Sequence, residues 1–386
     1  MKTGDFLKRK WSRFLTLGLF SFVVLKWRNR TIQCNVLEGG RRMKKRGWLL
    51  VLLSIGLALI WTTPSLAQVI KLTLADQNPP TGWGPVNALQ PWAKKVEEAT
   101  KNRVKIDIYP SQTLTKGPDI WNAVKTGVAD IGWCFHGYWP EMTPLYDVIT
   151  LPSLPIKTGE HGSEALWKLY ERFPSIQREF KDVHVLQLWA SPPRFLITSK
   201  KQVKTLEDLK GLKIRVPGGP ATEEMRALGA VPLLIPMPDN YQSLDKGIID
   251  GMDTSWDATY SFRLYEVVKF YTFVPLSSTH FSMAMNKQKW DSLPKDIQEA
   301  ITSVCGLEGS KFFGRNWYDT AEPFVVNHIK KEGFQMNTYT VPPEEAERWR
   351  KVGAEPIWKE WVKKMENKGR PEAQQVLNAL IELLKK

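Results

Sequence analysis

Cysteine and histidine are both scarce in this chain, which holds three cysteines and five histidines in 386 residues. Cys34, Cys134 and Cys305 form no CxxC pair and no Cys/His cluster at metal-ligand spacing, and the histidines are scattered. A disulfide framework and a zinc site both require such spacings. The composition therefore favours Cys134 and Cys305 as two separate buried thiols, with a single disulfide between them as the alternative.

The motifs that mark common enzyme sites are also missing. The sequence has no HExxH zinc motif, no GxSxG nucleophile elbow, no Walker loop and no GxGxxG dinucleotide motif. Asp245, Asp250, Asp253 and Asp257 lack the alternate-residue spacing of a calcium loop, so we expect them to cap helices and strand ends. We predict no catalytic residues, no metal and no cofactor, although an exported enzyme on an α/β scaffold is a rival interpretation.

A strong basic charge is absent from most of the chain, in spite of a net charge of +14. Residues 1–67 hold 13 Lys/Arg against two Asp/Glu, so +11 of the total lies there and only +3 remains from residue 68 onward. Binding to a phosphate backbone needs a basic patch or stripe on the folded domain. The sequence therefore argues against a nucleic-acid partner.

The basic N-terminal region contains the pattern of a cleaved secretory signal over residues 43–67. Three basic residues follow Met43, an apolar run extends from Trp48 to Trp61, and Ser-Leu-Ala precedes Gln68. The run has 14 residues, which is short against the roughly 20 needed to span a bilayer. We predict export, with residues 1–67 as a leader and residues 1–42 as a region upstream of the true start. The alternative for 1–42 is a genuine membrane-associated extension.

From residue 68 the chain alternates short β-type runs with helical ones, which is typical of an α/β fold. Strands are expected at 69–76, 103–110 and 129–135, with helices at 91–102 and 119–127, the latter ended by a glycine. The same alternation restarts after residue 192, which predicts a second α/β lobe. The β-runs 183–190 and 278–286 border this restart, so we expect the chain to cross between the lobes there, through a hinge.

Arg215 is the most informative single residue, because it stands in the strand KIRV between Ile214 and Val216. A charge on a covered sheet is costly unless it is paired, whereas a strand end that opens into a cleft lowers that cost. There a guanidinium offers a planar fork of donors for a carboxylate. An internal ion pair or a solvated side chain on an edge strand are the alternatives.

Aromatic residues follow two of the predicted strands. Trp133, Phe135, Tyr138 and Trp139 lie at or just after the strand 129–135, and Trp256 follows the strand IIDGMD of the second lobe. In open α/β sheets, ligands bind beyond the carboxyl ends of the strands. These rings could therefore wall a pocket, or they could be core residues that pack the lobes.

Several segments, taken in order, resemble the solute-binding receptors of tripartite ATP-independent periplasmic (TRAP) transporters, of the DctP type. The segments are RVKIDIYPSQTL, VKTGVADIGW, TLEDLKGLKIRVPGGPATEEMRALGAVP, MPDNYQSLDKGIIDG, YSFRLYEVVKFYT and MNKQKWDSLPKDIQEAI. The resemblance covers about residues 69 to 302, and LKGLKIRVP with YQSLDKGIIDG is its most specific part. It implies a two-lobed periplasmic solute-binding fold with a central cleft, hinge strands and a helical C-terminus. The expected lobes are 68–191 plus 281–320 (lobe I) and 192–280 plus 321–386 (lobe II).

The resemblance also implies a set of ligand-binding residues. Arg215 matches the arginine of the family's KxRVP motif, which pairs with the ligand carboxylate, and Arg194 matches a second arginine that precedes it. The resemblance also places six further residues at positions that line the cleft in the family, whether or not the residue type is the same. They are Asn78, Trp133, Phe135, Met237, Thr254 and Trp256.

This chain has MDTSWD at 252–257, where family members that bind small polar acids often have an ENP-like stretch. A hydroxyl and a large ring there make the pocket more aromatic, which favours a monocarboxylate with an apolar or aromatic body. The implied partners are this ligand and the small and large membrane permease subunits, and the implied location is the periplasm. A receptor that presents its ligand to a membrane sensor is the second alternative.

Overall fold

The computed structural model describes residues 26–27, 30–31 and 69–386. The first four of these form a short antiparallel pair, β1 (Lys26–Trp27) with β2 (Arg30–Thr31). The predicted signal at 43–67, Cys34 and most of the predicted leader lie outside the described residues. Within the described part of the chain, no helix has both the length and the apolar character that a membrane crossing requires.

The first of two larger sheets has the strand order β4-β3-β5-β12-β6. Its strands are β3 (Ile70–Ala75), β4 (Val104–Tyr109), β5 (Ile131–Phe135), β6 (Val183–Ala190) and β12 (His280–Asn286). β3 runs parallel to β4 and β5, whereas β12 runs antiparallel to β5 and β6. The strands predicted at 69–76, 103–110 and 129–135 are therefore confirmed, and both predicted crossing strands belong to this sheet.

We call the first sheet, with the helices that cover it, lobe I. These helices and short turns are η1 (Pro85–Leu89), α2 (Gln90–Ala99), η2 (Gly117–Asp119), α3 (Ile120–Thr126), η3 (His136–Tyr138), η4 (Tyr146–Thr150), α4 (Gly159–Arg172), α5 (Pro174–Glu179), α10 (Lys287–Ser292), α11 (Lys295–Thr302) and α12 (Gly306–Gly314). Alternate residues of β5 enter two different apolar clusters, Trp133 and Phe135 one and Cys134 the other. The sheet is thus covered on both faces, as the near-continuous apolar strands require.

The second sheet has the strand order β13-β11-β7-β10-β8-β9 and forms lobe II. Its strands are β7 (Phe195–Thr198), β8 (Lys213–Val216), β9 (Val231–Leu234), β10 (Gly251–Thr254), β11 (Phe270–Phe273) and β13 (Asn337–Thr340). Its shorter elements are α6 (Leu206–Leu209), α7 (Pro220–Ala227), η5 (Met237–Asp239), α8 (Asn240–Asp245), α9 (Trp256–Ser261) and η6 (Leu264–Glu266). β8 lies parallel between β9 and β10, so the end of the Arg215 strand opens beside the end of β10.

Local sequence signals set several boundaries as expected. Gly127 ends α3 in the left-handed region, with φ of +80°, a conformation that glycine adopts without a steric cost. Asp208 accepts a hydrogen bond from the N–H of Thr205 (3.2 Å) as part of a capping box at the start of α6. The glycine predicted from the sequence to end the helix 119–127 is confirmed.

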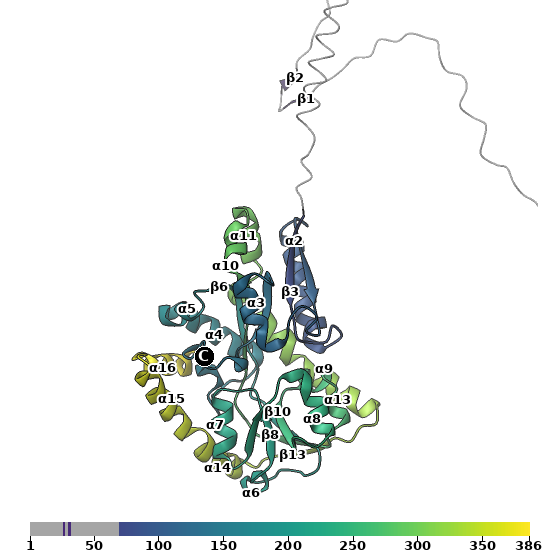
Figure 1. Ribbon diagram of the computed structural model, residues 1–386, viewed down its shortest axis with the longest axis vertical. Coiled ribbons are helices and arrows are strands. Elements are labelled where there is room, and N and C mark those ends of the chain that lie inside the picture. The colour runs from purple at the N-terminus through teal and green to yellow at the C-terminus, as the bar shows by residue number, and fades with distance from the viewer. Residues whose placement is uncertain (1–25, 28–29, 32–68) are drawn as a thin grey trace, which may run out of the picture. The chain divides into compact units, whose positions relative to one another are not determined.

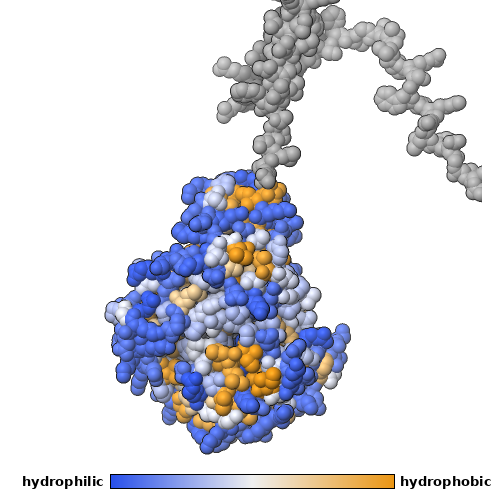
Figure 2. All heavy atoms as spheres, in the orientation of Figure 1, coloured by the Kyte–Doolittle hydropathy of each residue, from blue (hydrophilic) through white to orange (hydrophobic). Residues whose placement is uncertain are grey.

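One edge of the second sheet is formed by β9, which contains a proline. Pro232 has no N–H to donate, so it is tolerated on an edge strand and hinders the addition of a further strand there. The same strand exposes Val231 and Leu234. On the face drawn in Figure 2, hydrophobic side chains gather in separate areas within a mostly hydrophilic surface.

The C-terminal third of the chain contacts both lobes. α12 packs in lobe I, η7 (Arg315–Asp319) follows it, and α13 (Ala321–Lys331) joins the apolar cluster of lobe II. Beyond β13, α14 (Pro343–Gly353) packs on lobe II, while α15 (Glu355–Asn367) and α16 (Ala373–Leu383) join a cluster of lobe I (Figure 1).

The last two helices therefore do not follow the predicted assignment of 321–386 to lobe II. The apolar residues Ile357, Trp361 and Met365 of α15 pack with lobe I. An amphipathic helix buries its apolar stripe against whichever surface the chain reaches, and the sequence does not say which surface that is.

Candidate ligand-binding site

Two short segments carry the chain between the lobes. Residues 191–194 lead from β6 to β7, and residues 274–279 lead from β11 to β12. The segments lie side by side, because the N–H of Ser191 donates to the carbonyl of Thr279 (2.8 Å) and the N–H of Leu276 donates to that of Arg194 (3.1 Å). A pair of adjacent connections of this kind is a typical hinge between two rigid lobes.

A cavity of about 60 Å³ lies next to this hinge, between the ends of the strands of the two sheets. We call it the interlobe pocket. Seven of the eight predicted site residues line it, namely Asn78, Trp133, Phe135, Arg194, Arg215, Met237 and Thr254. Its volume is on the order of a few water molecules, so a ring-sized ligand would enter by opening of the lobes.

Arg215 projects from β8 into the pocket with only 4% of its surface exposed. Its Nε donates to the carbonyl of Ile235 (3.0 Å), while its two terminal nitrogens have no hydrogen-bond partner among the described residues. Burial lowers the pKa of Arg215, and nearby Tyr138 and Asp253 offset part of this change. The guanidinium is therefore oriented by one bond and keeps its terminal donors for another partner.

Arg194 lines the same pocket but already has an internal partner. Its Nη2 lies 2.8 Å from Asp253 Oδ2, and its Nε donates to the carbonyl of Ser277 (2.8 Å). The Nη2 contact has poor hydrogen-bond geometry, so we treat it as an ion pair rather than a hydrogen bond. Burial raises the pKa of Asp253, and Arg194 and Arg215 oppose the rise. An internal ion pair was an alternative for Arg215 in the sequence analysis. The structure has such a pair at Arg194 instead.

The apolar wall of the pocket comes from lobe I and η7. The ring of Trp133 stacks on Trp317, with centroids 5.3 Å apart, and packs against Phe281 at 4.8 Å. Phe135 lies 5.3 Å from Phe281. Trp317 and Phe281 were missed by the sequence reasoning. Trp317 lies in the polar stretch RNWYD and Phe281 in the strand HFSMAMN, and in neither does the residue pattern tell a ring that faces a cleft from one that faces the core.

Trp256 is a correction to the predicted site. It is the first residue of α9, and its ring lies against Phe195 (4.7 Å) and stacks on Tyr271 (5.8 Å) inside lobe II. It borders a groove of about 780 Å³ on the side of α14, which adjoins the interlobe pocket at Arg194 and Asp257 but which Arg215 does not line. The start of α9 turns this side chain toward β7 and β11, so Trp256 does not line the interlobe pocket.

Asp257, the next residue, does line the pocket, although the sequence indicated only a capping role for it. Its carboxylate accepts hydrogen bonds from Ser255 Oγ and from Nε1 of Trp317 (2.8 Å). Burial raises its pKa to about 6, against the hydrogen bonds from Ser255 and Trp317, which lower it. Asp257 takes part in none of the ion pairs formed within the described residues.

The lobes also contact each other directly at the mouth of the pocket. The hydroxyl of Tyr138 in lobe I accepts a hydrogen bond from the N–H of Met237 in lobe II (2.9 Å) and donates one to Gln77 (2.8 Å). The turn after β8 approaches η3 so closely that a Cβ on Gly218 would lie 2.2 Å from the carbonyl oxygen of Gly137. The closed arrangement therefore depends on glycine at position 218, which also has φ of +113°.

We expect Gly218→Ala to weaken ligand binding by about tenfold or more, because the added methyl group opposes closure by more than about 1.4 kcal/mol. Gly211→Ala is the matched control, since Gly211 also has positive φ but no atom within 4 Å of its added Cβ. Calorimetric titration of both variants measures the effect. Equal affinity in the two variants would contradict a steric block to closure.

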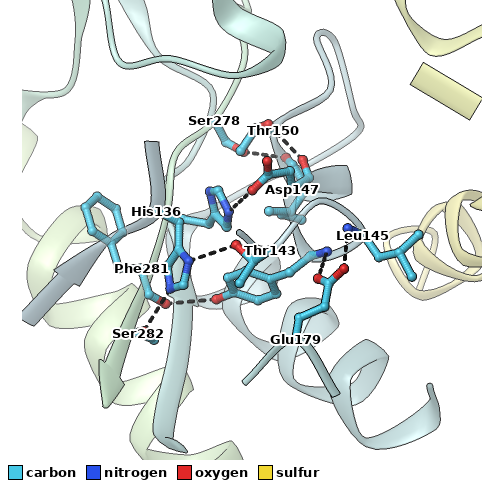
Figure 3. Close-up of polar contacts among 12 residues, drawn as sticks. His136, Thr143, Leu145, Asp147, Thr150, Glu179, Ser278, Phe281 and Ser282 are labelled. Atoms are coloured by element: carbon cyan, nitrogen blue, oxygen red, sulfur yellow. Dashed lines mark hydrogen bonds and ion pairs between the residues drawn. The ribbon is translucent and has the colours of Figure 1, made fainter. Parts of the chain in front are cut away.

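A buried polar cluster around His136 and Asp147 fixes the hinge end of β12 (Figure 3). His136 shares hydrogen bonds with Thr143 (2.9 Å) and Ser282 (2.8 Å), and His280 bonds Asp147 (2.8 Å). Burial lowers the pKa of His280 to about 3, so its imidazole is neutral at physiological pH. We assign the cluster a structural role, because it ties β12 to η4.

Neither a metal site nor a disulfide is present among the described residues. No group of three or more potential metal ligands comes together in the chain that the structure describes. Cys134 and Cys305 are both free and buried, as the sequence favoured. Burial raises the pKa of Cys305 to about 12, which keeps its thiol protonated and unreactive.

Two α/β lobes, a two-segment hinge and a pocket lined from both lobes define a two-lobed solute-binding protein. Residues 80–365 match the family described as bacterial extracellular solute-binding protein, family 7, and the chain belongs to this family. The resemblance to TRAP receptors of the DctP type and the predicted two-lobed α/β fold are thereby confirmed. The members of this family are solute receptors.

Solved structures with the same fold come from other TRAP solute-binding proteins. One, from Rhodoferax ferrireducens in complex with copurified benzoate, is 28% identical, has a TM-score of 0.77, and covers 82% of this chain and 98% of its own. A marine metagenome protein specific for aromatic acid ligands, in complex with 3-hydroxybenzoate, has the same identity, coverage and TM-score. Among curated proteins, the outer membrane transporter protein TsaT of Comamonas testosteroni is 27% identical over 81% of this chain and 92% of its own length.

Proposed function

We propose that this receptor binds the carboxylate of an aromatic or apolar monocarboxylate at Arg215 in the interlobe pocket. The observation that carries the proposal is the buried guanidinium of Arg215, whose terminal nitrogens have no partner among the described residues. A buried cation of this kind favours an anionic partner, and a carboxylate matches its planar donors with two parallel hydrogen bonds.

The remaining predicted residues have distinct roles in this proposal. Trp133 and Phe135, together with Trp317 and Phe281, exclude water from the body of the ligand. Arg194 holds Asp253 and is not the main carboxylate partner. Further lining residues supply polar and flexible contacts, namely Asn78, Met237 and Thr254.

The two structural neighbours with aromatic acids support this ligand class. Each shares 28% identity with this chain and covers 82% of it. The stretch MDTSWD, which replaces the ENP-like sequence expected for small polar acids, favours the same class. A dicarboxylate would place a second charge against an aromatic wall, where desolvation is costly.

The ligand would act by shifting the equilibrium between open and closed lobes. It contacts Arg215 in lobe II and the rings of lobe I at once, so the closed form gains contacts that the open form lacks. The closed receptor would then deliver its ligand to the small and large membrane subunits of an ion-gradient-driven permease. We place this step in the periplasm, after export through the signal at residues 43–67, and assign the receptor no catalytic step.

A thermal-shift screen tests the ligand class directly. Benzoate and phenylacetate, at about 100 times the dissociation constant, should stabilise the folded protein by about 2.7 kcal/mol and raise its melting temperature by several degrees. Succinate and malate at equal concentration should leave the melting temperature unchanged. A shift with the dicarboxylates alone would refute the proposal.

A further inference from the structure

Asp257 is a buried carboxylate in the ligand pocket that recognition of a simple monocarboxylate does not use. It is 7% exposed and faces the same cavity as Arg215, Trp133 and Phe135. A buried carboxylate is costly unless hydrogen bonds or a cation stabilise it. A carboxylate at this position therefore needs hydrogen-bond donors or a cation to stabilise it.

The partners that the protein supplies are incomplete. Ser255 Oγ donates to Oδ1, and Trp317 Nε1 donates to Oδ2 (2.8 Å), so each oxygen has one side-chain donor. The backbone N–H groups of Asp257 and Ala258 also favour the ionised form, but neither forms a hydrogen bond of normal geometry with the carboxylate. An ionised carboxylate can accept about four hydrogen bonds. Within the described chain no cation pairs with Asp257, and Arg194, which lines the same pocket, pairs with Asp253 at 2.8 Å. The carboxylate thus keeps the capacity to accept a donor from the pocket.

The charges of the pocket also limit what can bind beside Asp257. Arg194 and Asp253 neutralise each other, and Arg215 would be neutralised by one ligand carboxylate. A second ligand carboxylate would then lie beside the Asp257 carboxylate, and neither negative charge would have a cation in the pocket to neutralise it. Burial raises the pKa of Asp257 to about 6, so the group is mostly ionised at pH 7.5 and repels an anion.

We propose, resting on the proposed function above, that Asp257 determines specificity: it accepts a hydrogen bond from a donor group on the ligand and excludes a second carboxylate. The ligand would therefore be an aromatic monocarboxylate that carries a hydroxyl or amino group as well as its carboxylate. A site that hydrogen-bonds a ligand donor rejects the analogue without it, because the buried acceptor is then left unpaired.

Trp317 links this selectivity to closure of the receptor. Its indole nitrogen holds the Asp257 carboxylate of lobe II, while its ring stacks on Trp133 of lobe I at 5.3 Å. The aromatic wall and the acceptor are thus held together by one side chain. A ligand that fills the space between them satisfies both at once.

The test compares five ligands against wild-type protein and Asp257→Asn at pH 7.5 by calorimetric titration. Benzoate is the reference, 3-hydroxybenzoate and 3-aminobenzoate carry the two kinds of donor, 3-fluorobenzoate controls for size, and isophthalate carries a second carboxylate. Asparagine preserves the shape: its carbonyl can accept from Trp317, and its amide can donate to the Ser255 hydroxyl.

We expect the better of the two donor ligands to bind wild-type protein about tenfold or more tighter than benzoate or 3-fluorobenzoate. In Asp257→Asn this preference should fall to less than threefold, while isophthalate gains at least tenfold relative to benzoate. Comparison of 3-hydroxybenzoate with 3-aminobenzoate shows which of the two kinds of donor Asp257 prefers. Glu345→Gln is the matched control, because Glu345 is a buried acid on α14 of lobe II outside the interlobe pocket and should leave both ratios unchanged.

Two results would overturn the inference while leaving the proposed function intact. In the first, benzoate binds, and the affinity of the donor ligands relative to benzoate is the same in wild type and Asp257→Asn. The other is an equal loss of affinity for every ligand in the variant, which would make Asp257 a structural residue. If no aromatic monocarboxylate binds the wild type at all, the proposed function itself fails.

Discussion

Arg215→Ala is expected to abolish most of the ligand affinity, with a loss of about 2 kcal/mol or more, which is roughly thirtyfold. The guanidinium is buried and its terminal nitrogens have no partner in the part of the chain that the structure describes, so a ligand carboxylate would form two charge-assisted hydrogen bonds there. Arg215→Lys should recover only part of the affinity, because an ammonium cannot make the planar, two-bond contact. Titration calorimetry with benzoate measures both variants.

The control for this experiment is Arg226→Ala. Arg226 lies on α7 of the same lobe, is more than half exposed and pairs with Glu223, so its loss should leave the affinity unchanged. Both variants must unfold at temperatures close to that of the wild type for the comparison to be valid. Unchanged affinity in a folded Arg215→Ala protein would show that the carboxylate binds elsewhere.

Arg194→Ala is expected to act mainly on stability, with a loss of about 3–5 kcal/mol in the free energy of unfolding. The arginine is 3% exposed and lies 2.8 Å from Asp253, which is fully buried. Removing it leaves that carboxylate without its cation. Denaturant unfolding monitored by tryptophan fluorescence measures the loss.

A second variant separates the lost ion pair from lost packing. Arg194→Ala combined with Asp253→Asn removes the buried charge as well, and should be more stable than Arg194→Ala alone by at least about 1 kcal/mol. Because the two residues are in contact, their effects should be strongly non-additive. Strictly additive effects would mean that Asp253 is not compensated by Arg194.

Much of this site could be predicted from the sequence because strand ends in an α/β sheet lie at one edge. Arg215 stood out as a charge in the apolar strand KIRV, and the structure places it in the interlobe pocket beside Trp133 and Phe135. The position of a residue at a strand end is encoded locally, since period-two alternation fixes the side to which each side chain points.

Asp257 and Trp256 show where this local reasoning stops. They are neighbours in MDTSWD, yet one lines the pocket and the other packs on Tyr271 in lobe II. The difference depends on where α9 begins and on how it packs against η7, and neither is visible in the alternation of residues. Trp317 likewise reaches the pocket because helix packing turns its ring toward Trp133.

The sequence by itself determined the two α/β lobes, the hinge between them, the family and the arginine that we expect to hold the ligand carboxylate. These follow from periodicity, capping residues and a motif, all of which act over a few neighbouring positions. Only the tertiary structure decided that Asp253 holds Arg194, that Asp257 and Trp317 meet in the pocket, and that α15 and α16 lie on lobe I. Such contacts join residues far apart in the chain, and they depend on which surfaces the packed elements bring together.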